Sequence, residues 1–296
     1  MLLQKYFESR MQMIDEGLIS ALSFDKRYAG QLKEAIAKAV IPGGKRWRPL
    51  LLVSIFEMLT GLKKNNKILP DVIKAACAVE LVHNAALIHD DLPSVMNKKE
   101  RRGNLALHQE YGNAVAILAA DALFTLAFEI MGEIKDARKA NLAIRSLALN
   151  AKSYGMIGGQ VIDLASKRKV MKINTLRYID MKKVGSLLYA SAEIACILAG
   201  ADESTTGIMC SYAVNLGMAY QMITDIEKDY SRGSDGLDFS EEYVPVSKAG
   251  YTGLMGFDKT RKQVEGLLEE CSRSISPYPN NAVLMEFIQM IKERLP

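Results

Sequence analysis

The stretch 80–93 constrains the fold more than any other part of this sequence. It begins as an apolar run of helical character and ends in two adjacent carboxylates, Asp90 and Asp91, and the pair Arg101-Arg102 follows ten residues later. Adjacent aspartates at a helix end repel each other unless a cation lies near them. Mg²⁺ binds one or two carboxylates and completes its shell with substrate phosphates, and arginine binds phosphate bidentately. The stretch therefore indicates a Mg²⁺–diphosphate site, although a solvated acidic turn followed by a basic face explains it equally well.

The rest of the chain predicts helices throughout. Apolar residues recur at helical spacing, and no alternating strand pattern of useful length occurs. Composition does not change midway, so we predict one all-α domain over residues 1–296, a large helical bundle around a central cavity. Helices are expected within residues 1–40 and over about 50–62, 71–89, 113–134, 135–165, 174–198, 204–230, 258–275 and 281–295, with breaks at Gly155 and Gly158-Gly159 and a loop over 231–242.

The overall composition narrows the class of partner. A net charge of +4 is too small to argue for nucleic acid, but it suits anionic substrates. The N-terminus mixes charges early and has no signal-peptide core, and we expect no transmembrane segment, because no apolar run is read as long enough to span a bilayer. Four cysteines lie far apart without metal-ligand spacing, which fits a reduced, cytoplasmic protein. They are Cys77, Cys196, Cys210 and Cys271.

Further motifs accompany the aspartate pair in a fixed order along most of the chain. They are Gly43-Gly44-Lys45-Arg46-Trp47-Arg48-Pro49, the stretch 80–93, Arg101-Arg102-Gly103 with His108, Asp121-Ala122-Leu123, Gly158-Gly159-Gln160 with Asp163, Lys183 with Gly185, and 217–221. In this set and order the chain resembles the trans-isoprenyl diphosphate synthases, the family of farnesyl and geranylgeranyl diphosphate synthases. The resemblance runs from about Gly43 to Pro245.

The resemblance implies an isoprenoid synthase-like helical fold and a Mg²⁺-dependent prenyl transfer between isopentenyl diphosphate and an allylic prenyl diphosphate. The residues that would hold isopentenyl diphosphate are Lys45, Arg48, His83 and Arg102. Those that would contact the allylic diphosphate are Arg101, Lys183 and Gln221, and those that would carry Mg²⁺ are Asp90, Asp91 and Asp225. A homodimer is also implied.

Taken singly, these residues have ordinary structural explanations. Lys45 and Arg48 would suit a solvated helix start, His83 a hydrogen-bonded core histidine, and Lys183 the protein surface. Their joint occurrence in one order is what favours the functional interpretation.

The first aspartate-rich motif departs from the family pattern. The family carries a further aspartate downstream of Asp91, and this chain has Met96 there, which removes one metal ligand. Lys98 and Lys99 add positive charge where related chains are often acidic.

The second aspartate-rich motif departs further. After Gln221 the family has two adjacent aspartates and a later third, whereas this chain reads Thr224-Asp225 and then Lys228, so only Asp225 is in register. A family lysine ahead of the following proline is replaced by an acid, near Glu241.

Three interpretations remain open from these departures. The site works with altered metal ligation, for which Gln221, Asp225 and Asp229 share one helix face and offer a replacement stripe, although an ordinary solvated pair explains the two aspartates equally well. Alternatively, the chain is a catalytically weakened partner subunit that associates with a complete synthase. The third interpretation is a class I terpene cyclase, against which the isopentenyl diphosphate residues argue.

Product length has one local signal. By the resemblance, the residues five and four before Asp90 line the floor of the elongation pocket, and here they are Ala85 and Ala86. Small side chains leave room for a longer tail, and each buried CH₂ contributes about 0.8 kcal/mol. The resemblance therefore predicts a product of C20 or longer.

Overall fold

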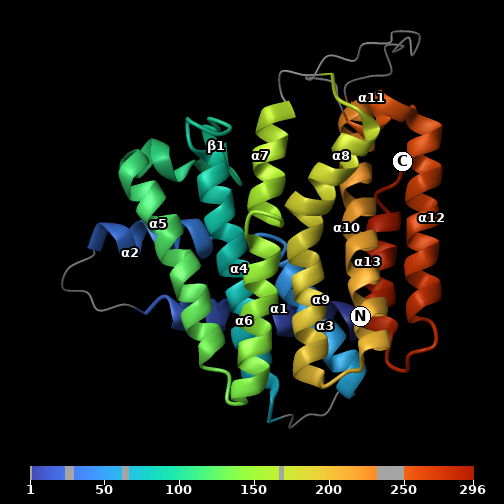
Figure 1. The fold of residues 1–296 in the computed structure, drawn as a ribbon, viewed down its shortest axis with the longest axis horizontal. Helices are drawn as coiled ribbons and strands as arrows, with labels where there is room; N and C mark the ends of the chain where they lie inside the picture. The colour runs from blue at the N-terminus through green and yellow to red at the C-terminus, as the bar shows by residue number, and fades with distance from the viewer. Residues whose placement is uncertain (1, 24–29, 62–66, 167–169, 232–249) are drawn as a thin grey trace.

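The computed structural model describes residues 2–23, 30–61, 67–166, 170–231 and 250–296 (Figure 1). Most of the predicted loop 231–242, including the acid at Glu241, lies outside these residues. The elements of the first half are α1 (Leu2–Ala21), α2 (Gly30–Val40), α3 (Trp47–Thr60), α4 (Leu69–Asp91), β1 (Glu100–Arg101), β2 (Asn104–Leu105), α5 (Leu107–Gly132) and α6 (Ala137–Ala151). The second half holds α7 (Met156–Ser166), α8 (Ile173–Asp180), a π-helix (Met181–Gly185), α9 (Ser186–Ala199), α10 (Glu203–Ser231), α11 (Tyr251–Met255), α12 (Phe257–Ile275) and α13 (Ala282–Lys292).

Helices with apolar residues on all sides form the centre of the bundle. α3, α4 and α9 bury residues around their whole circumference and pack against one another. Outer helices bury a single stripe: in α12 the buried residues are Thr260, Val264, Leu268, Cys271 and Ile275, at helical spacing. Figure 1 shows α5 toward one side of the bundle and α12 at the other. The expected all-α bundle is therefore confirmed.

The predicted helices agree closely with the observed ones, and the exception concerns Gly158-Gly159. In α5 the backbone of Gly112 has φ 80°, so the continuous helix starts next to Asn113, as predicted. Gly158-Gly159, however, lies inside α7 and does not break a helix. A Cβ on Gly159 would lie 2.8 Å from the Cβ of Lys182 and from the backbone nitrogen of Lys183. These glycines therefore permit close packing where a break was expected.

Residues 100–105 form a short hairpin that the sequence pattern did not reveal. β1 and β2 are antiparallel, with Glu100 opposite Leu105 and Arg101 opposite Asn104. Arg102 and Gly103 form the turn and both have positive φ, 54° and 77°. Strands of two residues are too short to show the period-two alternation that identifies a strand in sequence.

The expectation that no apolar run could span a bilayer is wrong in terms of length. Within the described residues, α4 and α5 are long and apolar enough to cross a membrane by length and composition. In α4, 72% of the relevant window is buried inside the bundle, as in a core helix, whereas in α5 the share is 44%. The apolar character of α4 is therefore used within the protein, and α5 leaves apolar residues exposed.

Candidate active site

Two buried carboxylates end α4 and organise one half of the site. Asp90 and Asp91 are 8% and 3% exposed. The C-terminal end of a helix carries partial negative charge, so two carboxylates there need nearby cations. Lys98 Nζ lies 2.9 Å from Asp90 Oδ2, and Arg101 donates to both oxygens of Asp91, with Nε 2.9 Å from Oδ2. Burial raises the pKa of Asp90, but Lys183, Lys98 and Arg101 outweigh it and hold that pKa below its usual value.

The hairpin explains how Arg101 reaches the carboxylates. Its side chain comes from β1, and the turn directs the next residue, Arg102, toward Asn84 of α4, with Nη1 3.5 Å from Oδ1. The hydrogen bonds to Asp91 raise the pKa of Arg101, so this guanidinium stays charged. The two adjacent arginines therefore serve two different parts of the site.

Lys183 approaches Asp90 from the opposite side. It lies in the π-helix, whose widened turn occurs frequently at functional sites. Its Nζ lies 2.9 Å from Asp163 Oδ2 and 3.5 Å from Asp90 Oδ1, and Gln160 Nε2 donates to the same Asp90 oxygen at 2.6 Å. Asp163 and Gln160 come from α7, which the glycine pair brings against the π-helix. Sequence reasoning recognised their motif but gave neither residue a role.

The predicted isopentenyl diphosphate residues line one cavity of about 830 Å³. Arg48 Nη1 lies 3.2 Å from His83 Nε2. Burial, together with the positive charges of Arg48 and Arg102, lowers the pKa of His83, so the imidazole is neutral at neutral pH and its Nε2 accepts this hydrogen bond. Arg48 Nε is buried without a partner, which leaves a donor for an anion. The predicted residues in its lining are Lys45, Arg48, His83, Arg102 and Gln221.

Arg46 lines this cavity and is held by a buried ion pair, and sequence reasoning gave it no role. It lies between the two predicted ligands of the motif, in a left-handed conformation with φ 46°. Its guanidinium is buried and contacts Glu80 Oε1 at 2.9 Å, Asp15 Oδ1 at 3.0 Å and the carbonyl of Val40 at 2.7 Å. The signal available in sequence was its position inside the Lys-Arg-Trp-Arg run. Because its donors are used internally, Lys45 and Arg48 remain directed at the cavity.

An aromatic side chain joins this cavity to the C-terminus. Tyr220 lines the cavity, and Lys45 Nζ lies 5.9 Å from its ring centroid. Arg294 lies over the same ring at 4.4 Å and forms an ion pair with Glu227. Arg294 is a further residue that sequence reasoning did not identify.

The acids of the second motif are engaged elsewhere. Asp225 Oδ2 accepts a hydrogen bond from the backbone nitrogen of Tyr251 at 3.1 Å, and its Oδ1 lies 3.3 Å from Lys228 Nζ. Asp229 accepts a hydrogen bond from the Thr252 hydroxyl. The predicted stripe on α10 therefore ties α11 to α10, and the metal role of Asp225 stays a prediction.

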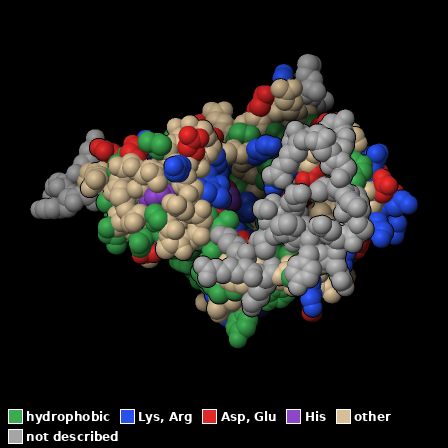
Figure 2. Space-filling view, turned by 90° about the horizontal axis from the view of Figure 1, so that it is seen from above, with side chains coloured by type: hydrophobic (Ala, Val, Ile, Leu, Met, Phe, Trp, Pro, Cys, Tyr) green, Lys and Arg blue, Asp and Glu red, His purple; other side chains and the backbone are tan. Residues whose placement is uncertain are grey.

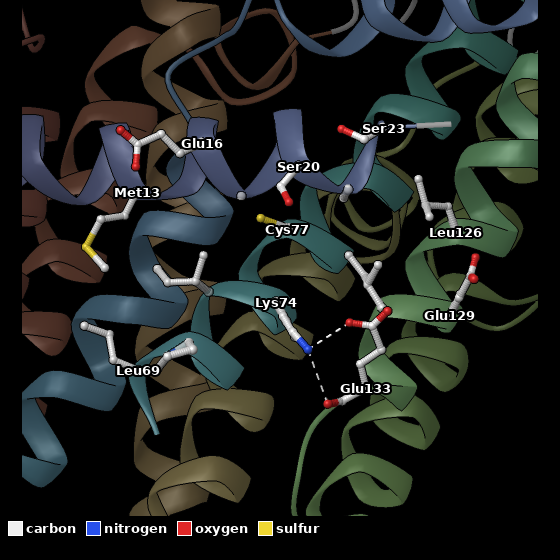
Figure 3. A pocket seen from close by; sticks show the side chains of 15 residues that line it. Met13, Glu16, Ser20, Ser23, Leu69, Lys74, Cys77, Leu126, Glu129 and Glu133 are labelled. Atoms are coloured by element: carbon white, nitrogen blue, oxygen red, sulfur yellow. Dashed lines mark hydrogen bonds and ion pairs between the residues drawn. The ribbon is translucent and has the colours of Figure 1, made fainter. Parts of the chain in front are cut away.

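A second large cavity lies between α1, α4 and α5 (Figure 3). Its volume is about 780 Å³, and its one lysine, Lys74, is paired with the Glu133 carboxylate at 2.8 Å. Glu16 and Glu129 also line it. In Figure 2, lysine and arginine side chains instead gather around a hollow at the end of the bundle. The cavity lined by Lys45, Arg48 and Arg102 is therefore a better candidate site for anionic substrates than this second cavity.

Comparison with known proteins identifies the family. Residues 30–236 match the sequence profile described as Polyprenyl synthetase. The chain belongs to the polyprenyl synthetase family. It is 40% identical over 259 residues to a farnesyl diphosphate synthase of Geobacillus stearothermophilus, covering 83% of this chain and 82% of that one. It is 35% identical over 255 residues to a geranylgeranyl diphosphate synthase of Cyanophora paradoxa, covering 84% and 83%.

A solved structure agrees with this assignment. A FPP/GFPP synthase from Zymomonas mobilis superposes with a TM-score of 0.86 and 29% identity, covering 98% of each chain. The fold of this polyprenyl synthetase is thus that of its family, and the resemblance inferred from the motifs is confirmed.

The metal ion that the family generally uses fits one part of this site. Asp90 and Asp91 supply the hard oxygen donors that Mg²⁺ prefers, and both end the same helix. Within the residues that the structure describes, no group of three or more His, Cys, Asp or Glu side chains could hold a metal. A metal here would therefore use Asp90 and Asp91 and take its remaining ligands from water or from a bound diphosphate.

We predict that Gly159→Ala destabilises the protein and weakens the Lys183 site. The new Cβ would overlap the backbone of the π-helix, and overpacking of this kind costs about 1 to 3 kcal/mol. Urea unfolding measures the change in stability. The matched control is Gly266→Ala at an exposed position of α12, where no atom lies within 4 Å of the new Cβ and alanine should stabilise by about 0.5 to 1 kcal/mol. Equal stability changes in the two variants would contradict this prediction.

Proposed function

We propose that this polyprenyl synthetase condenses isopentenyl diphosphate with an allylic prenyl diphosphate and releases pyrophosphate. The supporting observation is the relation of two anion sites along α4. His83 and Asp90 are seven residues apart on this helix, which corresponds to two turns, about 10 Å, and nearly the same face. Two diphosphates held near His83 and near Asp90 would leave their hydrocarbon groups between them, as a condensation requires.

The residues of the chain would divide the chemistry between the two sites. Lys45, Arg48 and Arg102 would hold isopentenyl diphosphate, with neutral His83 orienting Arg48. On the allylic side the C–O bond breaks, and its electron pair leaves with pyrophosphate toward cationic side chains, which stabilise the developing charge. The allylic cation then forms a C–C bond with the double bond of isopentenyl diphosphate. The product carbocation loses a proton to the departed pyrophosphate.

The residues on the allylic side would be Arg101 and Lys183, and Gln221 would contact the allylic diphosphate from the cavity that it shares with the isopentenyl diphosphate residues. Mg²⁺ held by Asp90 and Asp91 would supply additional positive charge to the leaving pyrophosphate, and Asp225 is the proposed ligand of a separate ion. We propose that the altered second motif lowers the number of protein ligands for that separate ion without removing the activity.

The second candidate is a catalytically weakened partner subunit of a complete synthase. It is favoured by one observation: Asp90, Asp91 and Asp225 all already pair with groups of the protein. A class I terpene cyclase is less well supported, because four cationic or neutral donors suited to a second diphosphate line one cavity.

Incubation with labelled isopentenyl diphosphate, Mg²⁺ and C5, C10 or C15 allylic diphosphates tests the proposal. We expect label in a longer prenyl diphosphate. Lys45→Met should raise the KM for isopentenyl diphosphate about tenfold, because one charged hydrogen bond is lost. Lys74→Met, in the second cavity, removes the same charge and should leave KM unchanged. Binding of both substrates without turnover would favour the partner subunit, and a cyclic hydrocarbon without isopentenyl label would indicate a cyclase.

We further propose a product of C20 or longer. Ala85 is fully buried in the core and Ala86, beside it on α4, is partly buried one turn before Asp90, so Ala86 is the better position to enlarge. The series Ala86→Val, Ala86→Leu and Ala86→Tyr should shorten the product stepwise, because each added group takes space from the tail. Chromatography of the dephosphorylated products measures this. An identical product distribution in all three variants would contradict the proposal.

We also propose that the chain forms a homodimer through α5 and α6, which pack against each other. Their exposed apolar side chains are Ile117, Leu118, Leu142 and Leu149. Leu118→Glu would place a charge in this surface and should shift the protein to monomer in sedimentation velocity experiments. Ile19→Glu, at an exposed apolar residue of α1, is the matched control. A wild-type monomer at micromolar concentration would rule out the homodimer.

A further inference from the structure

The turn after α4 folds back over the carboxylates that end the helix. The backbone nitrogen of Met96 donates to the carbonyl of Asp90 at 3.1 Å, and that of Lys98 donates to the carbonyl of Asp91 at 3.2 Å. Asn97 between them has φ 49°, a left-handed conformation that reverses the chain. The turn therefore fixes where the Lys98 side chain begins.

This geometry places the ammonium of Lys98 between the two acids. Its Nζ lies 2.9 Å from Asp90 Oδ2 and 3.9 Å from Asp91 Oδ1. A metal ion shared by the two carboxylates would use the same oxygens. The position of the ammonium is therefore one that a divalent ion would need.

The charges around the pair are already balanced. Three cations, Lys98, Arg101 and Lys183, face the three carboxylates of Asp90, Asp91 and Asp163. An incoming divalent ion would add two positive charges to a neutral group, and the departure of one cation would reduce that excess to one. Arg101 is held on both oxygens of Asp91, and Lys183 is shared with Asp163.

Lys98 is the cation that can leave. Its side chain is 37% exposed, and its flexible stem can carry the ammonium into solvent without moving a helix. We propose that Lys98 is a tethered counter-cation that competes with divalent metal ions for Asp90 and Asp91. It also lets a diphosphate approach these acids without a metal. This inference deepens the proposed function, because the diphosphate in question is that of the allylic substrate.

The test is Mn²⁺ binding to the full chain, measured by electron paramagnetic resonance. Lys98→Met keeps the apolar stem and removes the charge, and we expect it to bind Mn²⁺ about tenfold more tightly than the wild type. Lys98→Gln serves as a second variant with the same expectation. Lys99→Met, at an exposed neighbour, removes an equal charge and should change the affinity by less than about twofold. Mn²⁺ affinities of both Lys98 variants equal to that of Lys99→Met would overturn the proposal.

Inorganic pyrophosphate tests the second part. In EDTA, calorimetry should show weaker pyrophosphate binding to Lys98→Met than to the wild type and to Lys99→Met, and equal binding by all three would overturn this part. Tighter Mn²⁺ binding in Lys98→Met together with no isopentenyl incorporation by the wild type supports the counter-cation and removes the proposed function. Unchanged Mn²⁺ binding by Lys98→Met together with normal turnover by the wild type would overturn the counter-cation and support the proposed function.

Discussion

The burial of two adjacent carboxylates at the C-terminal end of α4 is the constraint on which much of this structure depends. At that end the helix dipole and the mutual repulsion of Asp90 and Asp91 both oppose ionisation, so cations must come from elsewhere. They come from three segments: the turn after α4, the hairpin β1–β2 and the π-helix. The close packing of α7 against the π-helix contributes to the same balance of charge, because it brings Asp163 of α7 next to Lys183.

The other half of the site is stabilised differently. Arg46 and Glu80 form a buried ion pair in the wall of the cavity that Lys45 and Arg48 also line. Breaking such a pair from one side generally costs about 3 to 5 kcal/mol, because it leaves an uncompensated charge. The segment around Arg46 is therefore held in place by hydrogen bonds within the protein, whereas Arg48 keeps free hydrogen-bonding capacity in its unpartnered Nε. Positioning and binding are performed by different side chains.

How far the sequence predicts this site depends on the range of the interactions. Helical periodicity identified the bundle, and the motifs identified Lys45, Arg48, His83, Arg102 and Gln221, which the structure gathers around one cavity. The pairing of Lys98 with the acids was not predicted, because it depends on a chain reversal at Asn97 that no periodicity signals. The contacts of Asp225 with α11 join residues 26 positions apart, and composition cannot reveal such a pairing. Sequence reasoning expected no apolar run long enough to span a bilayer, although α4 and α5 both reach that length and apolar character.

The location of both anion sites on one helix restricts how such a protein can evolve. Because His83 and Asp90 belong to the same uninterrupted stretch of α4, their separation is set by the rise per residue, about 1.5 Å, and by nothing else. Inserting or deleting one residue between them would rotate one site by about 100° relative to the other. Insertions and deletions between these two residues would therefore disrupt the relation between the two sites. Diversification of the product has to come from substitutions in the surrounding walls, while the reacting groups keep a constant separation.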